Sequence, residues 1–241
     1  MKDQAVIALP EQGTHALCIR PFHHAFFRDD GIDQIVRRHV EHRVPCIIAV
    51  GLDEGDRLVG VAITDGSRDV ILCTSEGKAI RFPEDDVRAM GRTAAGVRGI
   101  RVPDGVDVIS LIIPDADGLI LTASENGFGK LTSVEEFPVH GRGGQGVIAM
   151  QTSERNGRLV AAAQVATTDE LMLMSSSGTL VRTRAGEISV LGRNTQGVRL
   201  IRLDEGDALI GVEAVEPESG ESGEEGDAVE GASEAAHPPQ E

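Results

Sequence analysis

The chain has 241 residues, of which 40% are hydrophobic and only 2% aromatic, so it can bury a sizeable core that has to be aliphatic. No apolar run reaches the roughly 18 residues of a membrane-spanning helix, and Met1–Gln4 lacks the order of a secretory signal, so we expect no membrane partner. The formal charge of -16 would oppose nucleic-acid binding if it were evenly spread, but the acids are concentrated towards the C-terminal end.

Residues 1–43 have a composition of their own. We expect strands over Ala5–Pro10 and Ala16–Ile19 and a short helix over Gly31–Val40. Five of the seven histidines lie in this segment, and a metal site there would be drawn from His23, His24, His39 and His42. No carboxylate or cysteine completes a recognisable ligand set, and the three cysteines lack metal-like spacing, so we expect no metal and free thiols in a reducing cytosol. The segment is interpreted as a divergent copy of the repeat that follows, or as an altered reading of the gene upstream of Pro45.

Self-similarity with a period of about 50 residues dominates residues 44–215. Three landmarks hold this period, with offsets of 50 and 51 residues. The turn landmark occurs at Ser75–Lys78, Glu125–Phe128 and Ser176–Thr179. The motif G-R-x-x-x-G-V occurs at Gly91–Val97, Gly141–Val147 and Gly192–Val198, and an acidic turn at Asp53–Asp56 and Asp204–Asp207. Three landmarks with one period indicate repeated structural units.

Each unit contains four short runs with strand-like composition, separated by Gly, Asp, Ser or Pro turns. The runs of the first unit are Leu58–Thr64, Val70–Thr74, Ala79–Phe82 and Val97–Val102. Those of the second are Val108–Ile113, Leu119–Ala123, Lys130–Thr132 and Val147–Gln151. Those of the third are Leu159–Val165, Leu171–Met174, Leu180–Thr183 and Val198–Leu203. Four strands in about 50 residues predict an all-β, propeller-like array of blades. With single strands to spare at Cys46–Leu52 and before Val215, the array is expected to be an incomplete ring.

The last segment, residues 216–241, is predicted to be a disordered acidic tail. Ten acids and no Lys or Arg lie between Glu213 and Glu241, which leaves 29 acids against 23 bases in the rest of the chain. Such a segment cannot bury enough apolar surface to offset its ordering entropy. Its simplest role is to keep the chain soluble.

The loop Gly141–Gly146 contains four glycines and one arginine, Arg142. Glycines allow backbone N–H groups to approach a phosphate closely, and a guanidinium can bind the same phosphate. The loop lacks the Gly-Lys-Ser/Thr of a nucleotide-binding loop and precedes a strand instead of a helix. Because Arg92 and Arg193 occupy the same position in the other units, we expect a row of arginine-bearing loops on successive blades.

These loops resemble those of the C-terminal domains of bacterial DNA gyrase A subunits. The resemblance covers about Pro45 to Val215, and it is carried by Asp86–Ile100, by Gly178–Arg184 with Glu187–Val190, and by Gly192–Val198. It implies a β-pinwheel, a ring of six blades with strands exchanged between neighbours, whose rim binds and wraps DNA. The acidic tail also resembles the family pattern, in which it is thought to modulate wrapping.

Two departures limit the resemblance. The family's box of the type Q-R-R-G-G-x-G is normally in the first blade, whereas the nearest match here is His140–Gly146 in a later blade. The box, the early blades and the cleavage domain are therefore expected to be missing, as in a truncated fragment. Residues 1–43 match no part of the family.

The resemblance implies a DNA-binding role without catalysis by this chain alone. The expected DNA-binding residues are Arg92, Arg98, Arg142, Gly143, Gly144, Arg182, Arg184, Arg193 and Arg199. Type II topoisomerases cleave DNA through a tyrosine ester, and the chain has no Tyr and no nucleotide-binding loop, so neither catalysis nor a cofactor is expected. The implied partners are double-stranded DNA, the remainder of the gyrase A subunit and the gyrase B subunit in an A2B2 enzyme. The implied location is the bacterial cytoplasm, at the nucleoid.

Three alternatives remain open from the sequence. The first is the corresponding domain of topoisomerase IV, although the Gly-Arg loops and the acidic tail favour gyrase. The second is a propeller that serves as a protein-interaction module, although propellers with 50-residue kelch repeats depend on Tyr and Trp, which are absent here. The third is an enzyme built on a propeller.

Overall fold

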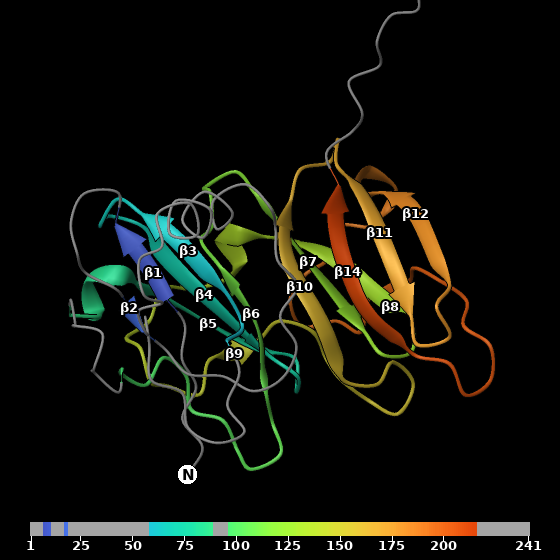
Figure 1. Ribbon diagram of the computed structural model, residues 1–241, viewed down its shortest axis with the longest axis horizontal. Coiled ribbons are helices and arrows are strands. Elements are labelled where there is room, and N and C mark those ends of the chain that lie inside the picture. The colour runs from blue at the N-terminus through green and yellow to red at the C-terminus, as the bar shows by residue number, and fades with distance from the viewer. Residues whose placement is uncertain (1–6, 11–16, 19–57, 89–95, 216–241) are drawn as a thin grey trace, which may run out of the picture.

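The computed structural model describes residues 7–10, 17–18, 58–88 and 96–215, and these form β-strands and three short 3-10 helices (Figure 1). The strands are β1 Ile7–Pro10, β2 Leu17–Cys18, β3 Val61–Thr64, β4 Asp69–Thr74, β5 Lys78–Pro83, β6 Val108–Ile112 and β7 Leu119–Ser124. They continue with β8 Phe128–Ser133, β9 Val147–Ile148, β10 Leu159–Val165, β11 Glu170–Ser175, β12 Leu180–Arg184, β13 Val198–Arg199 and β14 Leu209–Val215. The 3-10 helices are η1 Glu84–Asp86, η2 Val134–Glu136 and η3 Ala185–Glu187. The expected all-β class is confirmed.

Besides the sheet β2-β1-β3, the described residues form three sheets, each of which combines strands from two consecutive units (Figure 1). The first sheet has the order β6-β4-β5-β9, the second β10-β7-β8-β13, and the third β12-β11-β14. In all three, the hairpin of one unit pairs antiparallel with the first strand of the next unit. In the first two, the last strand of that next unit pairs with the other side of the hairpin. The four runs of a unit therefore do not form one sheet, and strands are exchanged between neighbours as the resemblance implied.

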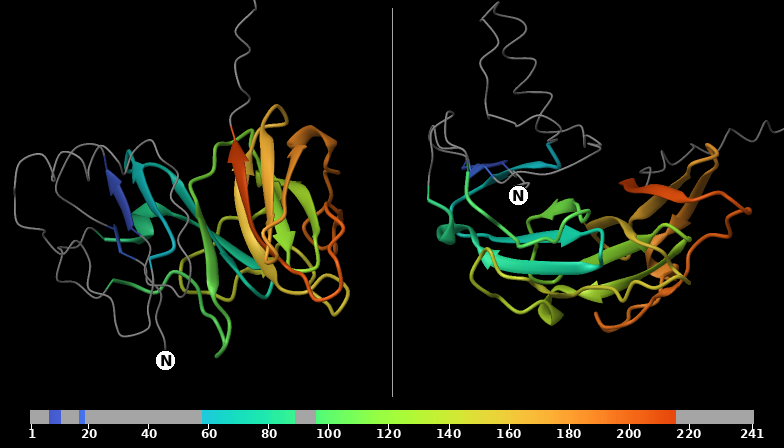
Figure 2. Two further views of the ribbon diagram at one scale, coloured as in Figure 1. Left: turned by 45° about the vertical axis from the view of Figure 1, so that its right-hand side comes forward. Right: turned by 90° about the horizontal axis from the view of Figure 1, so that it is seen from below.

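The sheets follow one another along an arc that does not close into a ring among the described residues (Figure 2). Side chains alternate between the two faces of each strand, so each hairpin contributes to two separate cores. Val70 and Leu72 face the part of the first unit that contains Ile100. Ile71 and Cys73 face the second sheet, and in the same way Leu121 of the second sheet packs with residues of the third. The inter-sheet cores expected from the composition are present and mainly aliphatic, but they also bury Phe82, Phe128 and Phe137.

The turn landmark explains where the outer strands end. Gly77, at the tip of the β4–β5 hairpin, has a φ of 79°, and a Cβ on it would collide with the carbonyl oxygen of Met150. The N–H groups of Ala149 and Met150 both donate to the Gly77 carbonyl oxygen, at 2.8 and 3.1 Å. The chain therefore bends around this glycine after Ile148, and the strand is shorter than the predicted Val147–Gln151.

The predicted strand Val97–Val102 is wrong, since the described residues 96–102 form no strand. In the second and third units the equivalent residues pair with the hairpin of the preceding unit, as β9 does with β5. The antiparallel pair β1–β2 precedes this unit, but it joins the unit through β1 alongside β3, and residues 96–102 pair with neither of its strands. Its residue Ile100 is still buried in the first core, as Met150 is in the second.

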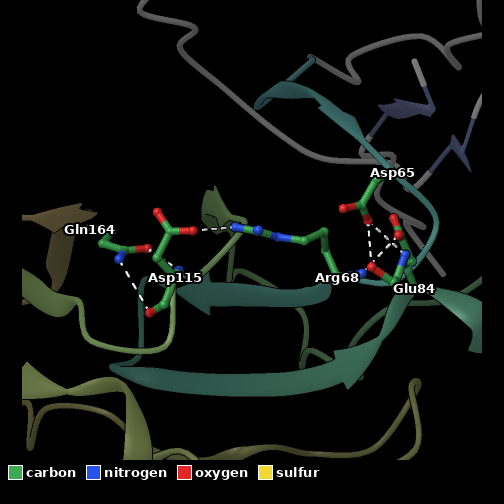
Figure 3. A network of polar contacts seen from close by, with 6 residues as sticks. Asp65, Arg68, Glu84, Asp115 and Gln164 are labelled. Atoms are coloured by element: carbon green, nitrogen blue, oxygen red, sulfur yellow. Dashed lines mark hydrogen bonds and ion pairs between the residues drawn. The ribbon is translucent and has the colours of Figure 1, made fainter.

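A polar network links the turns of three successive units (Figure 3). Arg68, after β3, forms an ion pair with Asp115 of the second unit. The Asp115 N–H donates to Oε1 of Gln164 on β10 at 2.8 Å. The N–H of Arg68 also donates to Oε1 of Glu84 at 2.9 Å, and Ser67 donates to Asp65 within the same turn. These contacts hold adjacent blades in register at one end of the sheets.

Several sequence predictions concern residues at the two ends of the chain. Within the expected strands Ala5–Pro10 and Ala16–Ile19 the structure has the shorter β1 and β2, with β1 parallel to β3. The expected helix at Gly31–Val40, the strand at Cys46–Leu52 and the tail after Val215 lie outside the described residues, as do the four candidate metal-binding histidines. None of the helices in the described part of the chain is long and apolar enough to span a membrane.

Candidate nucleic-acid interface

The Gly-Arg loops of the second and third units lie against the preceding unit. In the loop Gly141–Gly146, the Gly143 N–H donates to the Gly99 carbonyl oxygen at 2.5 Å, and the Arg101 N–H donates to the Gly144 carbonyl oxygen at 2.8 Å. In the loop Gly192–Gly197, the Thr195 carbonyl oxygen accepts from the N–H of Gln151 at 2.9 Å. Each loop therefore contacts the residues that follow the Gly-Arg motif of the preceding unit, and Arg101 and Gln151 make these contacts at equivalent positions.

The arginines of these loops are held in the same way. Arg142 donates from Nε to the Asp86 carbonyl oxygen at 2.7 Å and from Nη1 to the Arg98 carbonyl oxygen at 3.2 Å. Arg193 donates from Nη1 to the Ile148 carbonyl oxygen at 3.1 Å, and its own N–H donates to Oε2 of Glu136 at 2.8 Å. Each guanidinium has five N–H donors, so these bonds position the group and leave donors for a phosphate. Arg92 of the first unit lies outside the described residues.

Steric contacts explain why the last residue before the valine of each motif is glycine. Gly146 has a φ of 70° and Gly197 a φ of 76°, a left-handed region that glycine adopts readily. A Cβ on Gly197 would lie 2.6 Å from the Gly129 carbonyl oxygen, and one on Gly146 would collide with the Ala79 carbonyl oxygen. The following valine then begins the exchanged strand, β9 or β13. The final Gly-Val of the motif G-R-x-x-x-G-V therefore joins one blade to the next.

Lys130, which belongs to none of the sequence motifs, holds the loop Gly192–Gly197 by hydrogen bonds to its backbone. This residue of β8 is fully buried, and its Nζ donates to the carbonyl oxygens of Gly192 and Arg193, both at 2.6 Å. Thr132 Oγ1 donates to the preceding carbonyl oxygen, that of Leu191, at 2.9 Å. Burial lowers the pKa of Lys130 to about 8, and the nearby Glu136 partly opposes this. The sequence does single out Lys130, because the equivalent positions of the other units hold the aliphatic residues Ile80 and Val181.

The remaining predicted residues lie within the second loop, on the flanks of the loops or on strands. Gly143 and Gly144 belong to the second loop, and Arg98 accepts the Arg142 bond through its carbonyl oxygen. Arg182 on β12 forms an ion pair with Glu170. Arg184 is exposed at the end of the same strand, and Arg199 on β13 lies over the ring of Phe128. No group of three or more His, Cys, Asp or Glu side chains that could hold a metal occurs among the described residues.

Alanine at Arg142 or Arg193 is expected to lower both the melting temperature and the salt dependence of DNA binding. Loss of the bonds to the preceding unit should lower Tm by roughly 2–4 °C, since a net hydrogen bond contributes about 1 kcal/mol. Loss of one phosphate contact should reduce the slope of log K against log salt by about one. The matched control is lysine at the same position, which keeps the positive charge but lacks the several N–H donors of the guanidinium. Tm should therefore fall while the salt slope is retained. Slopes unchanged in both alanine variants would remove these arginines from the DNA-binding surface.

Comparison with known proteins identifies the family. The family described as DNA gyrase C-terminal domain, beta-propeller, matches residues 47–65, 68–115, 118–166 and 169–216. The chain belongs to this family. Two relatives are the DNA gyrase A subunit of Pseudomonas aeruginosa, 57% identical over 174 residues, and that of Escherichia coli strain K12, 51% identical over 168 residues. These alignments cover 72% and 70% of the chain but only 19% of each relative, so the chain spans about a fifth of their length.

Solved structures agree with the assignment to the gyrase C-terminal domain family. A DNA gyrase A C-terminal domain matches with a TM-score of 0.64 and 28% identity, covering 70% of this chain and 57% of that one. A DNA topoisomerase IV C-terminal domain matches with a TM-score of 0.66 and 26% identity, covering 70% and 53%. The two structures have similar scores, so the fold does not separate gyrase from topoisomerase IV. The sequence relatives described above are gyrase subunits.

Proposed function

We propose that the chain binds duplex DNA without base specificity and bends it along the blade array. The observation that carries this proposal is that the equivalent arginines Arg142 and Arg193 are held by equivalent contacts on successive blades of a gyrase-type domain. A curved row of cations holds DNA only if the DNA follows the curve. Bending 20–30 bp by 40–90° costs about 1–6 kcal/mol, which contacts distributed over several blades can offset.

The charge distribution supports the third unit as the main contact. Residues 151–203 contain seven arginines and four acids, whereas residues 103–150 contain two basic residues and seven acids. The predicted residues Arg182, Arg184, Arg193 and Arg199 all belong to the richer stretch. We therefore expect DNA to be held most firmly by the arginines that the third unit contributes to the second and third sheets.

Within a whole gyrase, this binding would support ATP-dependent negative supercoiling by an A2B2 enzyme that includes the gyrase B subunit. Such an enzyme acts on the chromosome, so its place would be at the nucleoid. The chain alone should neither cleave nor relax DNA and should not hydrolyse ATP, since it has no Tyr for the covalent step. DNA cleavage, DNA relaxation or ATP hydrolysis by the pure chain that persists after further purification would contradict this.

The proposed binding predicts a steep dependence on salt. Phosphate contacts release counterions, so affinity for unrelated 30-bp duplexes should be similar among sequences and fall steeply between about 50 and 200 mM salt. Fluorescence anisotropy with the full chain measures this. Closure of nicked circles by ligase in the presence of the chain measures bending, because wrapped DNA is trapped with an altered linking number. Affinity that does not change with salt would favour the protein-interaction module.

A further inference from the structure

Two arginines lie over one aromatic ring at the outer edge of the second sheet. Arg199 of β13 is the strand partner of Phe128 on β8, and its Cζ lies 5.3 Å from the ring centroid. The Cζ of Arg155, in the turn before β10, lies 4.7 Å from the same centroid. Both side chains belong to exposed residues, whereas the ring is only 4% exposed. A guanidinium stacked on a ring keeps its N–H edge available to a ligand.

Arg155 is held in place by amide side chains. Asn126 Nδ2 donates to the carbonyl oxygens of Glu154 and Arg155, both at 3.1 Å. The buried Asn156 accepts from the Ser153 N–H at 2.8 Å, which closes the turn. Arg155 itself donates from Nη1 to Oε1 of Gln196 at 3.2 Å. The turn thus presents a fixed cation, and its partner Gln196 belongs to the third Gly-Arg loop.

Neither of these two cations forms an ion pair with a carboxylate among the described residues, in contrast to three arginines elsewhere in the array. Arg68, Arg81 and Arg182 form ion pairs with Asp115, Asp69 and Glu170. A cavity beside Arg199 is also lined by Arg202, Asp204 and Asp207. The Asp207 carboxylate is already bound by the hydroxyl groups of Ser176 and Ser177, at 2.6 and 2.8 Å. Two guanidinium groups that lie over one ring, neither of them in an ion pair, form a site for an anion.

We propose that Arg155 and Arg199 together form a phosphate-binding site for the backbone of duplex DNA. The Phe128 ring lies beneath both guanidinium groups and supports them. This inference rests on the proposed DNA-binding function and deepens it. It adds Arg155 and Phe128, which the Gly-Arg motif does not include. The site lies on an exchanged strand, so it exists only when the second and third units are joined.

The test compares Arg155→Gln, Arg199→Gln and the double variant in the full chain. Each single change should reduce the slope of log K against log salt by about one, and the double change by about two. Arg158→Gln is the matched control, because it removes the same charge from the same turn. In the wild-type chain Arg158 donates from Nη1 to the Gly105 carbonyl oxygen at 3.3 Å and does not lie over the Phe128 ring, so Arg158→Gln should change the slope less than Arg155→Gln does. Phe128→Leu should weaken binding several-fold with the slope retained.

The outcomes separate this site from the proposed function. If the wild-type chain binds DNA with a steep salt slope, and Arg155→Gln and Arg199→Gln keep that slope, the site is wrong and the function stands. An equal decrease of the salt slope in Arg158→Gln would also overturn the site, because the slope would then depend on the net charge and not on the position of the arginine. A wild-type chain that binds DNA without salt dependence would overturn both. Melting temperatures within about 2 °C of wild type show that a changed slope does not come from unfolding.

Discussion

Alanine in place of Gly146 or Gly197 should lower the free energy of unfolding by about 3 kcal/mol, or Tm by roughly 6–12 °C. Both glycines have positive φ, where a Cβ is strained, and the added atom would strike a backbone carbonyl oxygen of the preceding hairpin. Neither neighbour can move aside easily, since Ala79 and Gly129 are paired in the sheet at that point. The exchanged strand would have to separate from its sheet. Thermal and urea unfolding measure the loss.

Gly144→Ala is the control within the same loop. A Cβ there would lie 3.6 Å from Cδ1 of Ile80, an ordinary contact, so stability should change by less than about 1 kcal/mol. Equal losses at Gly144 and Gly146 would mean that the loop tolerates no side chain anywhere. Full stability of Gly146→Ala would show that the strand junction is looser than the described contacts require.

Lys130 should make the domain more stable as the pH rises above 8. Its folded pKa of about 8 lies below the ordinary value of 10.5 because burial disfavours the charge. Between these two values the unfolded chain binds more protons than the folded one, so the free energy of unfolding increases with pH. Over the full window the increase is about 3 kcal/mol. Below pH 8 both states are protonated and this dependence disappears.

Lys130→Met should abolish this pH dependence and leave the fold intact, since the equivalent Ile80 of the first unit is aliphatic and buried. The measurement is Tm from pH 7 to 9. Burial raises the pKa of the Cys73 thiol to about 12, which gives the opposite slope above pH 9. A Cys73→Ala background removes that contribution and extends the window to pH 10. Parallel pH profiles of wild type and the Lys130→Met variant would exclude Lys130 as the titrating group.

The sequence predicted the strands well where local pattern is sufficient. Leu159–Val165 is found with the expected bounds, and the hairpins of all three units are within a few residues of expectation. The motif glycines were interpreted as phosphate-facing, whereas Gly146 and Gly197 are required by contacts with the preceding sheet. Those contacts join residues more than 60 positions apart, so no local pattern contains them.

The candidate site was predictable only where its residues recur with the period of the repeat. Equal spacing placed Arg142 and Arg193 at equivalent positions, and the structure shows equivalent contacts for both. The acceptors, the carbonyl oxygens of Arg98 and Ile148, are backbone atoms and have no residue signature. The pairing of Arg155 with Phe128 depends on a turn geometry set by two asparagines. Side chains that share a period could be aligned from sequence, but side chains that meet only across a sheet edge could not.

Exchange of strands between units has a consequence for how the array unfolds. In most repeat proteins each unit contacts its neighbours through side chains, so terminal units can fray independently. Here the first and second sheets each draw two strands from the following unit, so the backbone hydrogen bonds of one sheet cannot open without disturbing the next. Amide hydrogens of β5 and β8 should therefore exchange with one common rate under native conditions, through a single cooperative opening. Limited proteolysis should accordingly give the array whole or fully degraded, with no stable single blade.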